Sequence, residues 1–477
     1  MTTGKGSKAL LIASVAVAVF MARLDTYIVN ISLPAMARDF GVGTSAVSWV
    51  TMGFLLFNCG SMMLVGRLAD IVPPRRLFIW GYAIFTAGSL LCGFAPTLGL
   101  LILCRCIQGL GGAILVITTY TAVSRFLPAA EVGGAMGVLA TFGALGIAVG
   151  SPLGGFLTER FSWPWVFFVN VPVGIAAIAL ARWAMPGELG AERRPGGLDY
   201  PGSILSLVAV AAFILGLDAG HEMGWTSWQA LALLGLSAVC APLFLFRQWR
   251  AASPLVPPAL LRERRFLLAN SISVAGLMLM GGNAFLLPFL LERVKGLDAA
   301  RAGTVILTYS VLFMALSPLT GRLADRFAPW RLCAAGMGVA AADCILFAFA
   351  LGAPGIGTVV AFLAGLALAY ALFMAASSKQ VLGAAPADEK GAASAVYGTL
   401  YNLSLLLGVA AFETFYAGAG TSTVGILPGP GLRVAGFSRA YFFGACACAA
   451  SLLLALVFGS PRSSQAIDAG PMRKLEG

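Results

Sequence analysis

The chain has 477 residues, of which 59% are hydrophobic and only 11% carry a charged side chain. Soluble domains are about 25% charged and about 45–50% apolar, so this composition excludes a soluble protein and indicates an integral membrane protein. The net charge of +11 does not indicate nucleic-acid binding, because most Lys and Arg residues lie in segments expected on one side of the membrane, as the positive-inside rule describes.

Fourteen apolar segments of about 20 residues follow one another along the chain. Their unbroken apolarity favours helices over the alternating strands of a membrane barrel. The predicted fold class is therefore an all-α polytopic membrane protein. An even number of spans places both termini on one side, and the basic segments place that side in the cytoplasm. The predicted spans are 9–34, 46–65, 77–95, 98–123, 134–157, 165–185, 200–218, 228–246, 266–291, 302–320, 331–351, 356–378, 392–416 and 439–459.

The first span contains an aspartate, Asp25, where a charge is expensive. Asp at the centre of a membrane helix costs roughly 2.5 to 3.5 kcal/mol, so such a residue usually faces a bundle interior or a wet cavity. A carboxylate there can take up and release a proton. The alternative is a buried Asp that only ties helices together. Arg23 precedes it by two residues, on another helix face; it could snorkel, pair elsewhere or tune specificity.

Arg105 in the fourth span lies at the same depth as Asp25. Asp25 is nine residues before Pro34, and Arg105 is nine residues after Pro96, both prolines being at the outer boundary. At 1.5 Å per residue each lies about 14 Å below that boundary. An ion pair is therefore possible: proximity would keep Asp25 ionised, and separation with desolvation would favour its protonated form. The pair is a candidate proton-coupling switch, or else a static buried ion pair.

A repeated loop divides the chain into two related halves. Residues 66–77 read GRLADIVPPRRL, and 321–332 read GRLADRFAPWRL, each copy following the second of six spans. Internal repeats of this kind are typical of secondary transporters. We expect an N-terminal half at 1–185, a linker with two additional spans at 186–265, a C-terminal half at 266–459 and a cytoplasmic tail at 460–477.

These motifs resemble the major facilitator superfamily, specifically its fourteen-span drug–proton antiporter branch. Residues 24–34 are similar to the LDxTIVNVALP pattern of its first helix, with Tyr27 in place of Thr. The loop at 66–76 resembles GxLADRxGRR, residues 105–109 match RxxQG, and residues 163–174 are close to WxWxFxINxPxG. The fifth helix departs from the GPxxGG pattern, because Pro152 stands one place late. The resemblance implies two six-helix halves with two inserted helices, and proton-coupling roles for Asp25 and Arg105.

The two copies of the loop are candidate interior gates. In the first copy, Asp70 lies near Arg75 and Arg76, and a carboxylate near a helix N-terminus with Arg partners would stabilise the outward-open state. The alternative role is to anchor the topology. Asp325 and Arg326 form the equivalent, weaker candidate in the second copy.

Polar and aromatic residues within spans are candidates for contact with a substrate. Glu413 could attract a cationic substrate or serve as a second proton site, or it could be an interfacial Glu. The others could equally form hydrogen bonds between helices. The complete set of candidate substrate-binding residues is Tyr27, Asn30, Gln108, Asn283, Tyr397, Tyr401, Asn402 and Glu413.

The resemblance and the intramembrane charges together predict a proton-coupled antiporter that exports lipophilic, cationic drugs or toxic compounds by alternating access. An alternative is a dedicated exporter, or a symporter, of one endogenous metabolite or antibiotic; an anionic substrate would fit Arg23. A third is a membrane receptor without transport activity.

We expect no enzyme activity, no metal and no cofactor, because the nine cysteines show no pairing or metal spacing and no P-loop is present. The proton gradient would be the energy source. Expected partners are a small-molecule substrate, protons and the lipid bilayer, with no nucleic acid. We expect a monomer, with a periplasmic adaptor left open, in the inner membrane of a bacterium.

Overall fold

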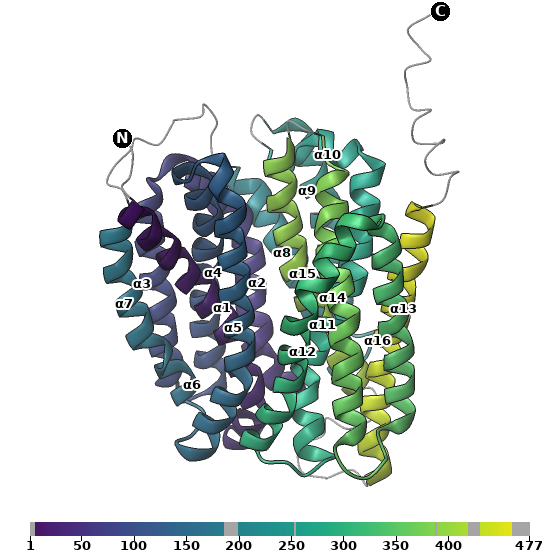
Figure 1. Cartoon of the computed structure of the whole chain (residues 1–477). Helices are drawn as coiled ribbons and strands as arrows, with labels where there is room; N and C mark the ends of the chain where they lie inside the picture. The colour runs from purple at the N-terminus through teal and green to yellow at the C-terminus, as the bar shows by residue number, and fades with distance from the viewer. Residues whose placement is uncertain (1–4, 186–198, 252–253, 387–388, 418–429, 460–477) are drawn as a thin grey trace, which may run out of the picture.

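The computed structural model describes residues 5–185, 199–251, 254–386, 389–417 and 430–459 (Figure 1). Within these residues every regular element is a helix, which confirms the all-α fold class. Thirteen of the described helices are long and apolar enough to cross a membrane, and the predicted span 46–65 lies in a further helix, α2, of 28 residues. Each of the predicted spans therefore coincides with a helical segment.

The N-terminal half contains six membrane crossings. The sixth is a short helix, α6, followed after one residue by α7. Their bounds are α1 (Lys5–Asp39), α2 (Thr44–Ile71), α3 (Pro74–Gly93), α4 (Leu98–Phe126), α5 (Ala129–Arg160), α6 (Trp165–Phe168) and α7 (Asn170–Ala184).

The C-terminal half repeats this order beside the first half (Figure 1). Helix α1 packs most closely on α5, and α11 likewise packs on α15; the pairs α2–α4 and α3–α4 correspond to α12–α14 and α13–α14. The bounds in this half are α11 (Arg264–Arg293), α12 (Ala299–Arg326), α13 (Pro329–Ala350), α14 (Gly357–Gly383), α15 (Lys390–Ala417) and α16 (Pro430–Phe458).

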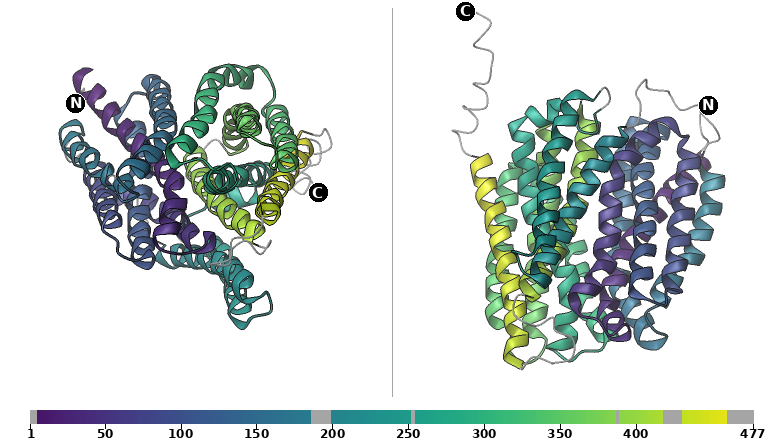
Figure 2. Two further views of the ribbon diagram at one scale, coloured as in Figure 1. Left: turned by 90° about the horizontal axis from the view of Figure 1, so that it is seen from below. Right: turned by 180° about the vertical axis from the view of Figure 1, so that it is seen from behind.

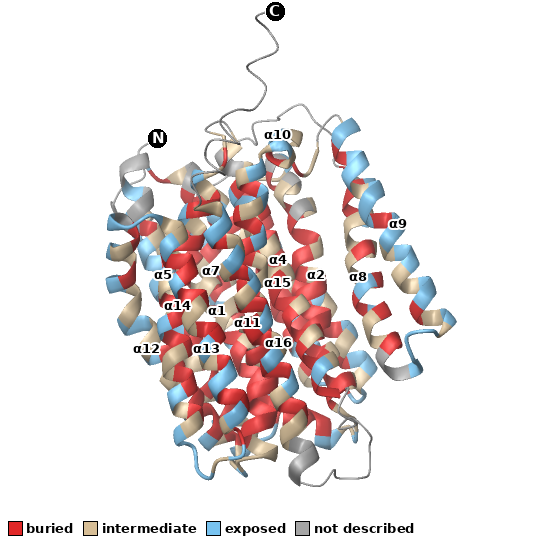
Figure 3. Ribbon diagram, turned by 90° about the vertical axis from the view of Figure 1, so that its right-hand side faces the viewer, coloured by how far each residue is buried: buried red, intermediate tan, exposed pale blue. Residues whose placement is uncertain are grey.

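A pair of helices, α8 (Tyr200–Met223) and α9 (Trp228–Arg250), joins the halves in sequence and lies at the periphery of the bundle, where α8 packs against α2 and α15 (Figure 2). Asp218 of α8 accepts hydrogen bonds from Ser45 and Trp49 of α2, at 2.9 and 3.0 Å. Helix α9 presents mostly exposed apolar residues (Figure 3), as expected of a helix that faces lipid. The short α10 (Pro258–Arg262) precedes α11.

The repeated loops form matching turns. Helix α2 ends at Ile71 and α3 begins at Pro74; α12 ends at Arg326 and α13 begins at Pro329. Proline suits the first turn of a helix, because its fixed φ is helical and its missing N–H has no partner there in any case. The turns lie on the face of the bundle where α1 begins and α16 ends, which we name the terminal side; the opposite face is the distal side.

Close helix packing joins the halves near the distal side. A Cβ added to Gly155 of α5 would collide with the carbonyl oxygen of Ala299, and one added to Gly303 of α12 would collide with that of Ser151. Arg38, near the end of α1, also forms an ion pair with Glu292 of α11. These contacts close the seam between the halves on the distal side.

Candidate functional site

Asp25 lies in contact with Arg105, as their equal depth allowed. The Arg105 Nη1 atom is 2.7 Å from the Asp25 carboxylate, and the two side chains are 1% and 0% exposed. Arg105 also donates from Nε to the Val50 carbonyl, and its guanidinium lies 4.3 Å from the centre of the Phe54 ring. The charge of each residue is therefore neutralised inside the N-terminal half.

Two amides complete the environment of the carboxylate. Gln108 donates to Asp25 at 2.8 Å and accepts from Arg105 at 2.7 Å. Residues 105 and 108 face the same way because residues three apart on a helix are neighbours. Asn170 opens α7 and donates to both Asp25 and Ser89, at 3.0 and 3.2 Å. Asn170 was not among the predicted site residues, although it is an amide within an apolar span and part of the motif at residues 163–174.

This cluster can respond to a proton. As a carboxylate, Asp25 accepts every hydrogen bond offered to it and balances the charge of Arg105. Protonation removes that negative charge and turns one oxygen into a donor, which leaves Arg105 as an uncompensated cation in a buried place. Removing one partner of a buried ion pair costs about 3–5 kcal/mol, so protonation of Asp25 would strongly weaken this cluster.

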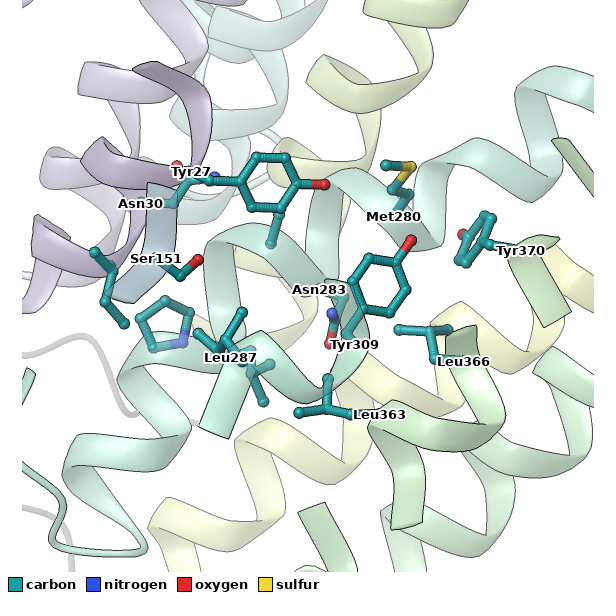
Figure 4. A pocket seen from close by; sticks show the side chains of 14 residues that line it. Tyr27, Asn30, Ser151, Met280, Asn283, Leu287, Tyr309, Leu363, Leu366 and Tyr370 are labelled. Carbon is teal, nitrogen blue, oxygen red and sulfur yellow. The ribbon is translucent and has the colours of Figure 1, made fainter. Parts of the chain in front are cut away.

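A pocket lies between the two halves and is lined by residues of both (Figure 4). The hydroxyl ends of Tyr27, Tyr309 and Tyr370 and the sulfur of Met280 gather in the same part of it. The described lining is uncharged, so the cavity suits an aromatic or apolar guest held by a few polar contacts. It consists of Tyr27, Asn30, Ile31, Ser151, Met280, Asn283, Ala284, Leu287, Pro288, Ile306, Tyr309, Leu363, Leu366 and Tyr370.

Three of the predicted substrate-binding residues line this cavity: Tyr27, Asn30 and Asn283. Asn30 accepts a hydrogen bond from Thr51, and Asn283 accepts one from Tyr441. Tyr401 adjoins the lining, because its hydroxyl is 3.8 Å from the Met280 sulfur.

Four other candidates lie outside the described lining. Gln108 belongs to the Asp25 cluster instead. Asn402 donates to the Gly398 carbonyl within α15, and Glu413 is buried on the same helix. Tyr397 packs beside a separate apolar cluster around Phe266. Sequence alone placed these residues within spans but did not show which face of each helix they occupy.

The cavity has lining residues that sequence reasoning did not single out. Met280, Tyr309, Tyr370 and Ser151 come from α11, α12, α14 and α5. The tyrosines are polar groups within apolar segments, the same signal that identified Tyr27.

The predicted gate residues are only partly described. Arg75 donates to the Arg182 carbonyl at 2.6 Å, a contact between α3 and α7, and Arg326 is exposed. Arg76 has a partner as well. The side chains of Asp70 and Asp325 lie outside what the structure describes, so the gating role stays a prediction.

Within the described residues, no group of three or more His, Cys, Asp or Glu side chains is placed to hold a metal ion. The described cysteines are unpaired, and most are buried among apolar side chains.

Comparison with known proteins places the chain among transporters. The family description "Major Facilitator Superfamily" matches residues 15–409. The riboflavin transporter RibZ of Clostridioides difficile is 28% identical over 452 residues, covering 94% of this chain and 97% of RibZ. The putative multidrug resistance protein MdtD of Salmonella typhi is 32% identical over 338 residues, 71% of each chain. The multidrug resistance protein Stp of Mycobacterium tuberculosis is 32% identical over 308 residues, 64% of this chain and 57% of Stp.

The fold has a counterpart among solved structures. A bacterial homologue of the human lysosomal transporter Spinster, in an inward-facing and unoccupied conformation, superposes with a TM-score of 0.67 at 15% identity. The superposition covers 96% of this chain and 98% of that one. This likeness confirms the predicted arrangement of two six-helix halves.

Proposed function

The chain belongs to the major facilitator superfamily, and from that premise we propose that it is a proton-coupled secondary active exporter of lipophilic compounds. The observation that carries the proposal is the Asp25 cluster: a buried carboxylate, neutralised by Arg105, next to a cavity shared by both halves. The relatives named for multidrug resistance support export of foreign compounds.

Proton binding and substrate movement would be linked through helix α1. Asp25 and the cavity residues Tyr27 and Asn30 lie within two turns of this helix. A proton on Asp25 weakens its hold on Arg105, and the resulting shift of α1 against α4 and α7 alters the cavity wall. A ligand shifts a conformational equilibrium only by its difference in affinity for the two states, and the lost ion pair supplies such a difference for the proton.

The proposed orientation puts the terminal side in the cytoplasm of a bacterium, with the chain in its inner membrane. Most Lys and Arg residues outside the spans lie on that side, which supports this orientation. Protons would enter from the distal side and leave on the terminal side, while substrate moves outward. We propose a monomer as the transporting unit, with an adaptor partner left to experiment.

A second candidate is dedicated export or uptake of one planar metabolite. The similarity to a riboflavin transporter along nearly the whole chain favours it, as do the three tyrosines around the cavity. Both candidates share the same proton site and cavity and differ in the range of substrates. The described lining holds no carboxylate, so it gives no support to the expected preference for cations.

The test is transport by the full chain in proteoliposomes with an imposed proton gradient. Ethidium and riboflavin serve as fluorescent probes, one a lipophilic cation and one a neutral planar compound. We expect gradient-driven transport of at least one probe, and we expect Asp25→Asn to lower its rate by at least about a hundredfold, the lower end of the range for loss of an essential proton-transfer group.

Asp218→Asn is the matched control. It removes one carboxylate charge from α8, a helix that contributes no residue to the described cavity lining, and we expect transport close to wild type. Transport by Asp25→Asn at the wild-type rate, or wild-type transport that persists after an ionophore collapses the gradient, would show that the proton-coupling proposal is wrong. Transport of riboflavin alone would select the dedicated transporter.

A further inference from the structure

Arg23 is a cation in the middle of α1 that no described carboxylate neutralises. Its Nη1 atom donates to the Tyr401 hydroxyl at 3.0 Å, and its guanidinium lies 5.1 Å from the centre of the Tyr401 ring. Tyr401 belongs to α15, so the contact crosses from one half of the protein to the other. Asp25 is two residues away, but its carboxylate is already occupied by Arg105 on another face of α1.

The position of Arg23 is at the edge of the cavity. Arg23, Tyr27 and Asn30 follow the spacing of one helix face, and the latter two line the cavity. On the opposite wall, the Tyr401 hydroxyl is 3.8 Å from the sulfur of Met280, another lining residue.

Helix α5 packs closely on α1 around Arg23 through its glycines. A Cβ added to Gly146 would lie 3.0 Å from the Arg23 Cβ atom and 2.6 Å from the Phe20 carbonyl oxygen. Gly143 is also next to α1, with the Arg23 Cγ atom 3.8 Å from its added Cβ. With no side chain from α5 in the way, α1 approaches closely, and the Arg23 guanidinium reaches Tyr401 of the C-terminal half.

The hydroxyl of Tyr401 satisfies only part of what a guanidinium requires. Arg has five N–H donors and a permanent charge, and a neutral hydroxyl supplies one acceptor and no compensating charge. Charges inside membrane helices are costly and are retained for function. The missing partner is an anion, and the guanidinium fork matches the two oxygens of a carboxylate.

We propose that Arg23 is the anion-recognition residue of the substrate site, and that the preferred cargo is a planar aromatic compound with one carboxylate group. The carboxylate pairs with Arg23, and the ring lies among Tyr27, Tyr309 and Met280, where aromatic and sulfur contacts stabilise it. This inference rests on the proposed function in taking the cavity between the halves as the transport path. The cargo charge that it names agrees with the anionic alternative drawn from the sequence and is opposite to that of the predicted cationic drugs.

The test uses three probes of one ring size and different charge: 2-naphthoate, 2-naphthamide and 2-naphthylmethylammonium. Isothermal titration calorimetry on the full chain in detergent, at neutral pH and fixed salt, gives the Kd of each. We expect 2-naphthoate to bind about tenfold more tightly than the other two, as one added charge-assisted contact predicts.

Variants assign the preference to Arg23. We expect Arg23→Gln to bind the three probes equally, and Arg23→Lys to keep part of the preference, because Lys keeps the charge without the fork. Arg293→Gln is the matched control: Arg293 also donates to a tyrosine hydroxyl, that of Tyr416, at 3.2 Å, but lies outside the cavity between the halves. It should keep the full preference.

Several results would overturn the inference: equal binding of the probes by wild type, an intact preference in Arg23→Gln, or an equal loss in Arg293→Gln. Binding of 2-naphthamide by Arg23→Gln shows that the cavity of this variant is intact. If Arg23→Gln binds no probe, the test relies on Arg23→Lys, and complete loss of the preference for 2-naphthoate in that variant overturns the inference.

The binding test and the transport test fail independently. Proton-driven transport without a preference for 2-naphthoate would contradict only the role of Arg23. A preference that depends on Arg23, in a protein that does not couple transport to protons, would contradict only the proposed function.

Discussion

The two halves join equivalent pairs of helices by different chemistry. In the N-terminal half, Arg105 of α4 and Asn170 of α7 both bind the carboxylate of Asp25 on α1. In the C-terminal half, Tyr370 of α14 donates to a carbonyl of α11, and Tyr441 of α16 donates to Asn283 of α11. The contacts of α1 are therefore charged where those of α11 are neutral.

The difference shows how a repeated architecture can divide its tasks. A carboxylate held by an arginine changes its interactions when it takes up a proton, whereas hydroxyl-to-carbonyl and hydroxyl-to-amide bonds keep the same form across the physiological pH range. The C-terminal half supplies most of the cavity lining. We therefore expect the N-terminal half to respond to protons and the C-terminal half to shape the substrate site.

The largest loss of stability should come from removing the cation of the Asp25–Arg105 ion pair. Arg105→Gln leaves Asp25 buried without its counter-ion, which costs about 3–5 kcal/mol of folding stability while Asp25 stays ionised. The apparent Tm in detergent measures this loss. The double variant Asp25→Asn/Arg105→Gln has no uncompensated charge, so it should recover part of the stability but not proton-coupled transport. Equal Tm values for the single and double variants would contradict this account.

An intermediate loss of stability should appear equally in both halves, because each half packs a glycine-containing helix against the first helix of its repeat. Gly150→Val on α5 would drive its side chain into Tyr27, whose Cβ is 2.8 Å from an added Cβ, and Gly408→Val on α15 into the backbone of α11. Overpacking of this kind costs about 1–3 kcal/mol, again read from the apparent Tm.

The same two helices provide the controls for these glycine variants. Nothing lies within 4 Å of a Cβ added to Gly137 of α5 or Gly398 of α15, so a valine at either position should change the Tm little. A control that destabilises as much as its partner would indicate a general intolerance of valine rather than close helix packing.

The smallest effect should follow from a change in the neutral contacts. Tyr441→Phe keeps the buried ring and loses the hydrogen bond to Asn283, which costs about 1 kcal/mol. Transport should keep its dependence on the proton gradient, with a rate within a few-fold of wild type. Loss of gradient dependence in this variant would mean that proton coupling is shared between the halves.

Sequence reasoning was most successful where placing a residue in the membrane has a large free-energy cost, as it has for a charged side chain. The order of spans followed from apolar length, and the depth of Asp25 and Arg105 allowed the contact that the structure contains. The faces of the helices were harder to predict. Gln108 looked like a substrate contact but points to Asp25. Tyr309 and Tyr370 line the cavity, although nothing in the sequence set them apart from other tyrosines within spans.

The faces of the helices were hard to predict for a physical reason. Inside a membrane bundle, helix faces that contact lipid and faces that contact other helices are both apolar, so hydropathy does not reveal rotation about the helix axis. Position along a span can be counted from its ends, whereas rotation depends on which neighbours pack closely. The glycines of α5 were visible in the sequence, but the helix on which they pack was not.

The helix pair α8–α9 makes the two flanks of the transporter unequal towards the surrounding lipid. The halves meet along two seams, α5 against α12 and α2 against α15, and α8 contacts both helices of the second seam. A compound dissolved in the bilayer therefore reaches the first seam directly but meets α8 and α9 on the other flank (Figure 2). For cargo that arrives from the membrane rather than from water, the protein has an open flank and a screened one.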